Sequence, residues 1–101
     1  MKLEEFKALI QGKTFKSTDG GFEYRFIPEN TLTVNGDMSK SVHYSITEED
    51  SVFILNHNSM FGTEPLVIDI ISTNPPVTFG LSKQHSKEFE GTWKEVLKNL
   101  P

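Results

Sequence analysis

The sequence predicts a mainly β protein: an antiparallel up-and-down meander of about seven strands, curled or closed into a small barrel, with a short helix at each terminus. Three observations support this fold class. Apolar and polar residues alternate along several short segments, turn-forming residues separate these segments, and helical spacing is confined to the two ends of the chain. Short connections join neighbouring antiparallel strands, so the segments follow one another around the sheet.

The amino-terminal helix is predicted over residues 3–10. Leu3, Phe6 and Ile10 recur at helical spacing, which gives the segment one apolar face. Gly12 follows where a helix commonly ends on a residue with a positive φ.

The strands are predicted from a period of two. Tyr24 and Phe26, for example, flank Arg25, so the aromatic rings share one face of the sheet and the guanidinium lies on the other. The seven predicted strands cover residues 13–18, 22–27, 31–34, 42–47, 52–56, 66–72 and 77–82.

Two of these strands, 52–56 and 66–72, are apolar on both faces and therefore need cover on both. A carboxy-terminal helix over about residues 88–99, with Thr92 as its N-cap and Trp93 on its apolar face, is the predicted cover. Any part of the outer face of these strands that the helix leaves bare is a predicted homodimer contact.

Composition indicates a single domain spanning residues 1–101. The chain is 36% apolar and includes eight Phe, enough for a core without metal or disulfide support, and it has no cysteine. Residues 1–6 carry two acids and precede no apolar run, and no stretch of about 18 apolar residues occurs. We therefore expect a cytoplasmic protein that has no membrane partner.

The charge is unevenly distributed. Nine acidic residues lie between Thr14 and Ser82, against Lys16, Arg25 and Lys40, and the whole chain has a net charge of −4. Phosphate backbones require clustered Lys and Arg, so nucleic acid is not an expected partner. A basic protein partner is the electrostatic alternative.

The order of the meander places the connections 35–41 and 57–65 at one end of the sheet and the helix 3–10 at the other. Long loops that gather at one end of a sheet commonly carry function. The ligand site is therefore predicted at the 35–41/57–65 end.

This layout resembles the lipocalin-like (calycin-type) small β-barrels. The segment 9–15 is similar to their opening Gly-x-Trp signature, although Phe15 stands one position after the expected Trp. Their layout has a helix before the first strand, a strand meander, one open end and a later helix. The resemblance implies that a small apolar molecule binds inside the barrel, and it transfers no binding residue.

Four residues are the candidate ligand-binding set. Tyr24 and Tyr44 lie on inward-facing rows, where they either line a cavity or fill the core. His57 and Phe61 belong to the longest connection, which either contacts a ligand or folds back to plug the barrel.

Catalytic and metal sites have weaker signals. The three histidines do not share metal-ligand spacing, the acid run 48–50 lacks the distributed ligands of a calcium loop, and no motif indicates a cofactor. Asp69 interrupts an apolar strand, either as a functional carboxylate or because its position is less buried.

Three functions remain open. The leading hypothesis is a non-enzymatic, lipocalin-like domain that binds a small apolar ligand. The alternative is an acidic protein-interaction module of the antidote or adaptor type. The third is a small enzyme that uses Asp69 or His57.

Overall fold

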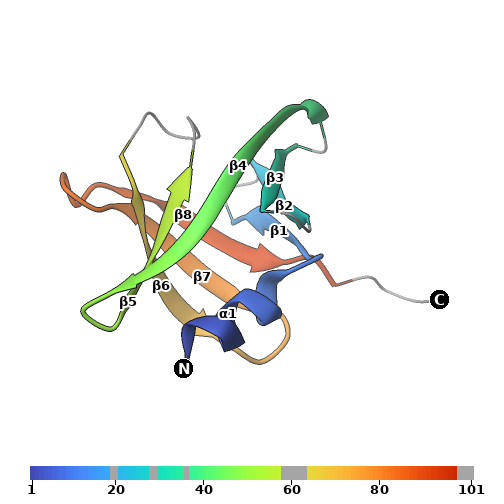
Figure 1. Cartoon of the computed structure of the whole chain (residues 1–101). Coiled ribbons are helices and arrows are strands. Elements are labelled where there is room, and N and C mark those ends of the chain that lie inside the picture. The colour runs from blue at the N-terminus through green and yellow to red at the C-terminus, as the bar shows by residue number, and fades with distance from the viewer. Residues whose placement is uncertain (19–20, 28–29, 36, 58–63, 98–101) are drawn as a thin grey trace.

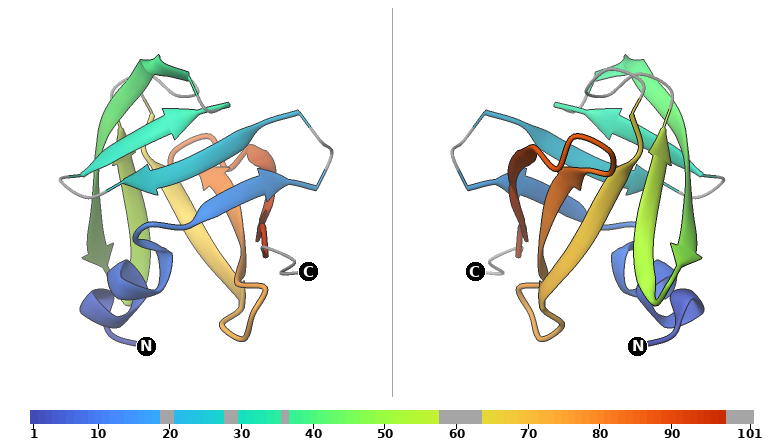
Figure 2. Two further views of the ribbon diagram at one scale, coloured as in Figure 1. Left: turned by 90° about the vertical axis from the view of Figure 1, so that its right-hand side faces the viewer. Right: turned by 90° about the vertical axis from the view of Figure 1, so that its left-hand side faces the viewer.

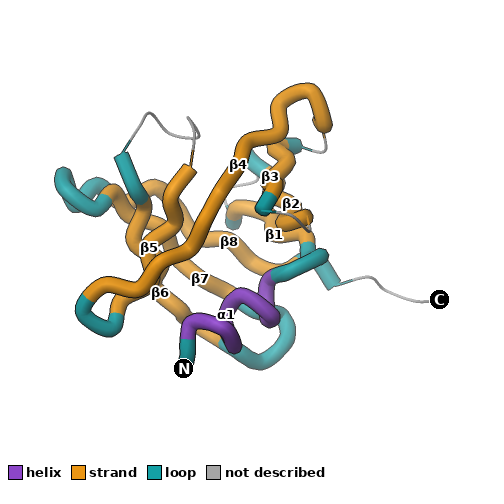
Figure 3. Tube along the Cα trace, viewed as in Figure 1, coloured by secondary structure: helices purple, strands orange, loops and turns teal. Residues whose placement is uncertain are grey.

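The computed structural model describes residues 1–18, 21–27, 30–35, 37–57 and 64–97. These residues form one helix and eight strands (Figures 1 and 3). Their bounds are α1 Leu3–Ile10, β1 Thr14–Ser17, β2 Glu23–Ile27, β3 Thr31–Val34, β4 Asp37–Glu49, β5 Val52–His57, β6 Leu66–Ser72, β7 Thr78–Lys83 and β8 Phe89–Glu95.

The strands form a closed antiparallel barrel in chain order. Each strand pairs with the next, and β8 returns to pair with β1. This confirms the mainly β fold class and the closed form of the meander. The barrel has eight strands, and the additional one is β8, at the position where a helix was predicted.

The predicted helix 88–99 is wrong for its described part, because Phe89–Glu95 is a strand. β8 fills the gap between β1 and β7, and its backbone supplies hydrogen bonds to both sides. The N–H of Thr18 donates to the carbonyl of Thr92 at 2.9 Å, and the N–H of Glu95 donates to the carbonyl of Val77 at 2.8 Å. A helix here would leave both neighbouring strand edges without these partners.

The predicted amino-terminal helix is confirmed over its full range. The backbone N–H of Lys2 donates to the carboxylate of Glu5 at 3.2 Å, which completes a cap at the first turn. Phe6 and Ile10 are buried, and Gly12 ends the helix with a φ of +76°. Figure 2 shows α1 at the same end of the barrel as the β4–β5 and β6–β7 turns.

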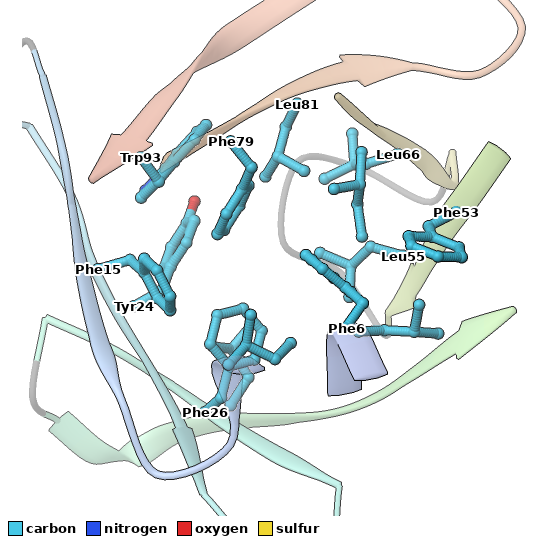
Figure 4. Packing of buried hydrophobic residues seen from close by; sticks show 14 of the residues in the cluster. Phe6, Phe15, Tyr24, Phe26, Phe53, Leu55, Leu66, Phe79, Leu81 and Trp93 are labelled. Carbon is cyan, nitrogen blue, oxygen red and sulfur yellow. The ribbon is translucent and has the colours of Figure 1, made fainter. Parts of the chain in front are cut away.

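Aromatic side chains fill much of the barrel interior. The ring of Phe15 lies 5.6 Å from that of Phe26 and 5.0 Å from that of Phe79, centre to centre. Tyr24 stacks on Trp93 with 5.0 Å between ring centres and 15° between ring planes. Figure 4 shows these rings converging from strands on different sides of the barrel. Such contacts stabilise the core beyond the burial of their area.

The loop predicted at 35–41 is wrong, because β4 already begins at Asp37. β4 is long because it serves two neighbours in turn: its first part pairs with β3, and the part from Tyr44 onward pairs with β5. One wall of the predicted open end is therefore continuous strand.

The outer faces of β5 and β6 have no helix over them in the described structure, contrary to the expected cover. Ile54 is nonetheless only 3% exposed, whereas Val52 and Ile71 are 38% and 57% exposed. The outer faces of β5 and β6 are thus apolar and partly exposed to solvent.

Candidate functional site

Tyr24 belongs to the core. It is 1% exposed, and its ring lies between the inner faces of β2 and β8, against Trp93. The sequence left two roles open for this residue, and the structure places it where it fills the interior. An eight-stranded barrel is either filled by side chains or holds one small ligand, and the ring of Tyr24 occupies interior space.

Tyr44 lies at the edge of the core. Its ring makes an edge contact with Phe26 at 5.3 Å, and it helps to line a groove of about 250 Å³ between α1 and β4. Partial burial raises the pKa of the Tyr44 hydroxyl, because the charged phenolate loses water. Lys7 and Gln11 of α1 line the same groove.

His57 lies opposite Tyr44 in the pairing of β4 with β5. Its Nε2 is 2.9 Å from the backbone carbonyl oxygen of Glu64, so it bridges the two ends of the connection between β5 and β6. Phe61, the fourth predicted site residue, lies outside the described residues. The structure therefore brings Tyr44 and His57 together and places Tyr24 in a different part of the barrel.

The carboxylate of Glu64 holds the turn between β7 and β8. It accepts hydrogen bonds from the backbone N–H groups of Ser86, at 2.8 Å, and of His85. The pKa of Glu64 is lowered, first by the Ser86 hydrogen bond, because these donors favour the charged carboxylate. This anchor fixes the described end of the 57–65 connection, and no sequence pattern indicates it.

Asp69 and His57 do not share a catalytic arrangement. Phe53 pairs with Ile68, which places Asp69 near the start of β5 and His57 at its end. Asp69 is exposed on the outer side of β6, which confirms the expectation of a less buried position. Within the described residues, no group of three or more His, Cys, Asp or Glu side chains is placed to hold a metal ion.

One groove at the gap between β5 and β6 has polar and apolar surface in nearly equal parts. It measures about 420 Å³ and lies where β5 and β6 separate beyond their last paired residues, Phe53 and Ile68. Its lining consists of Met1, Ser51, Val52, Phe53, Val67, Ile68, Asp69 and Ile70. We refer to it below as the β5–β6 groove.

A second outer surface is cationic. Closure of the barrel brings Lys94 of β8 directly opposite Lys16 of β1, and Arg25 of β2 lies opposite Thr14 of the same strand. All three cationic side chains are exposed. We call the outer surface formed by Lys16, Arg25 and Lys94 the cationic face.

Two adjoining grooves follow the cationic face. One, of about 360 Å³, includes Lys16, Lys94 and Val96, and the other, of about 430 Å³, includes Arg25, Val96 and Leu97. Glu95 lines both grooves, and Glu23 lines the second beside Arg25. Val96 and Leu97 are 45% and 47% exposed, so apolar surface lies beside the positive charges.

This surface is not apparent from the sequence, where Lys16 and Arg25 are isolated cations in an acidic region and the predicted helix 88–99 includes Lys94. In a strand, successive side chains point to opposite faces, so a strand over Phe89–Glu95 with Trp93 inside places Lys94 on the outer face of the barrel. Its pairing with Lys16, however, follows only from barrel closure.

No helix in the described part of the chain combines the length and apolar character needed to span a bilayer. Searches against protein-family models, curated proteins and solved structures gave no match to this chain.

Proposed function

We propose that this protein is a non-catalytic protein-binding domain that contacts its partner with the outer surface of the barrel. The observation that supports this most is the packing of the described interior residues, where large rings such as Trp93, Tyr24 and Phe79 are at most 2% exposed. The two grooves beside the cationic face lie on the outer surface and combine charged with exposed apolar side chains, and the β5–β6 groove reaches the core residues Phe53 and Ile68. Mixed surfaces of this kind suit protein contacts better than enclosure of a small molecule.

A small apolar ligand is the second candidate. The closed barrel with a helix at one end supports the lipocalin-like layout, and the β5–β6 groove offers a place for such a ligand among the described residues. Its volume of about 420 Å³ falls within the usual range for ligand sites, and apolar side chains such as Val52 and Ile70 contribute to its lining. The same surface is where the homodimer was expected.

The expected basic partner has its own candidate surface. Glu48, Glu49 and Asp50 are exposed at the β4–β5 turn, and Glu4 and Glu5 are exposed on α1. An adaptor or antidote that binds a basic protein would use these carboxylates. A partner protein could therefore bind either of two outer surfaces of opposite charge, the cationic face or the carboxylates of the β4–β5 turn and α1.

Affinity purification from cells of the source organism tests the proposal. The tagged full chain is compared with three outer-surface variants, Lys94→Glu, Glu49→Lys and Val52→Asp, each checked to unfold near the wild-type temperature. We expect the wild-type chain to recover a protein that at least one variant loses. Recovery of no specific protein, or equal recovery by all four chains, would contradict the proposal.

A further inference from the structure

We propose that the cationic face binds a short acidic segment of a partner protein, with Val96 and Leu97 contacting an apolar residue of that segment. This inference rests on the proposed protein-binding function, for which it names the surface and the chemistry of the partner. It follows from the unusual placement of like charges, from the neighbouring apolar surface and from the charge of the rest of the molecule.

The pairing of Lys16 with Lys94 is unfavourable for the isolated protein. Like charges directly opposite each other on adjacent strands repel, whereas an opposite charge would stabilise the pair. No carboxylate of the described residues lies within ion-pair distance of Lys16, Arg25 or Lys94. A chain with more acids than bases nonetheless keeps these cations together, as is typical where a local rule is broken for function.

The nearest carboxylates do not neutralise the face. Glu95 interacts with Lys13 at 3.9 Å and accepts a hydrogen bond from the backbone N–H of Val77 at 3.0 Å, so its charge is already engaged. Glu23 lies directly opposite Lys16 on its other side and offsets part of the positive charge, although the two side chains form no ion pair. One unengaged carboxylate thus faces three cations. The face therefore keeps positive charge to offer to a partner.

The apolar residues beside the charges indicate a peptide and not a free anion. Val96 lines both grooves of the cationic face, and Leu97 lines one of them. A free phosphate or carboxylate would gain nothing from these side chains. An acidic segment with an apolar residue would gain ionic contacts and bury part of Val96 and Leu97.

The size of the face favours a short segment over a nucleic acid. Glu23 and Glu95 border the cations, and the whole molecule carries a net charge of −4. A long polyanion would extend past the face and meet the acids beyond it. In a closed barrel every strand also has a neighbour on each side, so the segment would be held by side chains and not as an added strand.

A defined peptide tests this proposal in the purified full chain. The probe is a fluorescent peptide of three Glu-Asp-Leu-Gly repeats, blocked at both ends, and the control peptide has Gln and Asn in place of the acids. Binding is measured by fluorescence anisotropy at about 20 mM and about 150 mM salt. We expect the acidic peptide to bind, more weakly at the higher salt, and the control peptide not to bind.

Lys94→Glu is the informative variant, and Lys87→Glu is its matched control. Lys87 is exposed in the β7–β8 turn, away from the cationic face, and the two substitutions change the net charge equally. Lys94→Glu should weaken peptide binding at least tenfold, and Lys87→Glu less than twofold. Lys94→Glu should also raise the Tm by about 2–5 °C, because it replaces repulsion with attraction to Lys16.

Several results would overturn the proposal. These are no peptide binding at low salt, equal weakening by Lys94→Glu and Lys87→Glu, a lower Tm for Lys94→Glu, or tighter binding of a DNA duplex than of the peptide at about 150 mM salt. The proposal would also be overturned if the wild-type chain self-associates and Lys94→Glu abolishes this self-association. A second copy of the chain would then be the partner that binds the cationic face. If the cellular partner is lost with Glu49→Lys and kept with Lys94→Glu, the acidic-segment proposal fails while the protein-binding function stands.

Discussion

Gly91 lies against the ring of Trp93 in a backbone conformation that favours glycine. Its φ is +143°, and a Cβ built on it would lie 3.2 and 3.3 Å from two carbons of the Trp93 ring. The backbone conformation strains any side chain at this position, and the indole would have to shift by a few tenths of an ångström to admit one. The helix predicted over residues 88–99 includes this position and gives no reason for a glycine there.

Replacing Gly91 with Ala should therefore destabilise the protein by about 2–4 kcal/mol, because it adds a steric clash to backbone strain. Gly12→Ala is the matched control, since Gly12 also has a positive φ, +76°, but has no atom within 4 Å of the added Cβ. Its expected cost is about 1 kcal/mol. Urea denaturation of the two variants measures the difference, and equal losses would show that the indole does not restrict position 91.

At the scale of single residues, the sequence predicted the core better than the site. Alternation correctly placed Tyr24 and Phe26 inside the barrel, because burial follows the period of two in a strand. The contact of Glu64 with the β7–β8 turn could not be predicted, since it joins residues 21 and 22 positions apart through backbone N–H groups.

This Glu64 contact links two elements, the connection after β5 and the turn before β8, and it should make stability depend on pH. The folded-state pKa of Glu64 lies below its ordinary value, so the carboxylate contributes stability that is complete above the unfolded-state pKa. That contribution is lost as the pH falls through the folded-state pKa.

The variant Glu64→Gln should consequently be less stable than wild type at neutral pH, and the difference should shrink as the pH falls below about 5. Glu48→Gln, which changes an exposed carboxylate of β4, is the control for the general effect of one charge. Thermal unfolding between pH 3 and pH 7 measures both variants. A Glu64→Gln difference that is constant across this range would contradict the assigned hydrogen bonds.

At the scale of elements, local pattern predicted α1 and the first seven strands but failed for β8. Trp93, Val96 and Leu97 are spaced as on a helix, and Thr92 with Glu95 matches a helix cap. What determines the structure here is the need of β1 and β7 for hydrogen-bond partners. That requirement arises from strands far away in the sequence, so a local reading could not include it.

At the scale of the whole molecule, barrel closure decides both the shape and the distribution of charge. Pairing of β8 with β1 joins the two ends of the meander and gathers Lys16, Arg25 and Lys94 on one outer surface. The acidic residues of the β4–β5 turn lie on other strands (Figure 1). A count along the chain gave the correct net charge but could not show this separation.

Native mass spectrometry of freshly purified protein, before and after denaturing extraction, tests the central claim that binding takes place on the outer surface. The account predicts one mass under both conditions, equal to that of the chain itself, because the described interior residues pack closely against one another. A retained small molecule that is released only on denaturation would contradict the account and would establish the barrel as a ligand-binding domain.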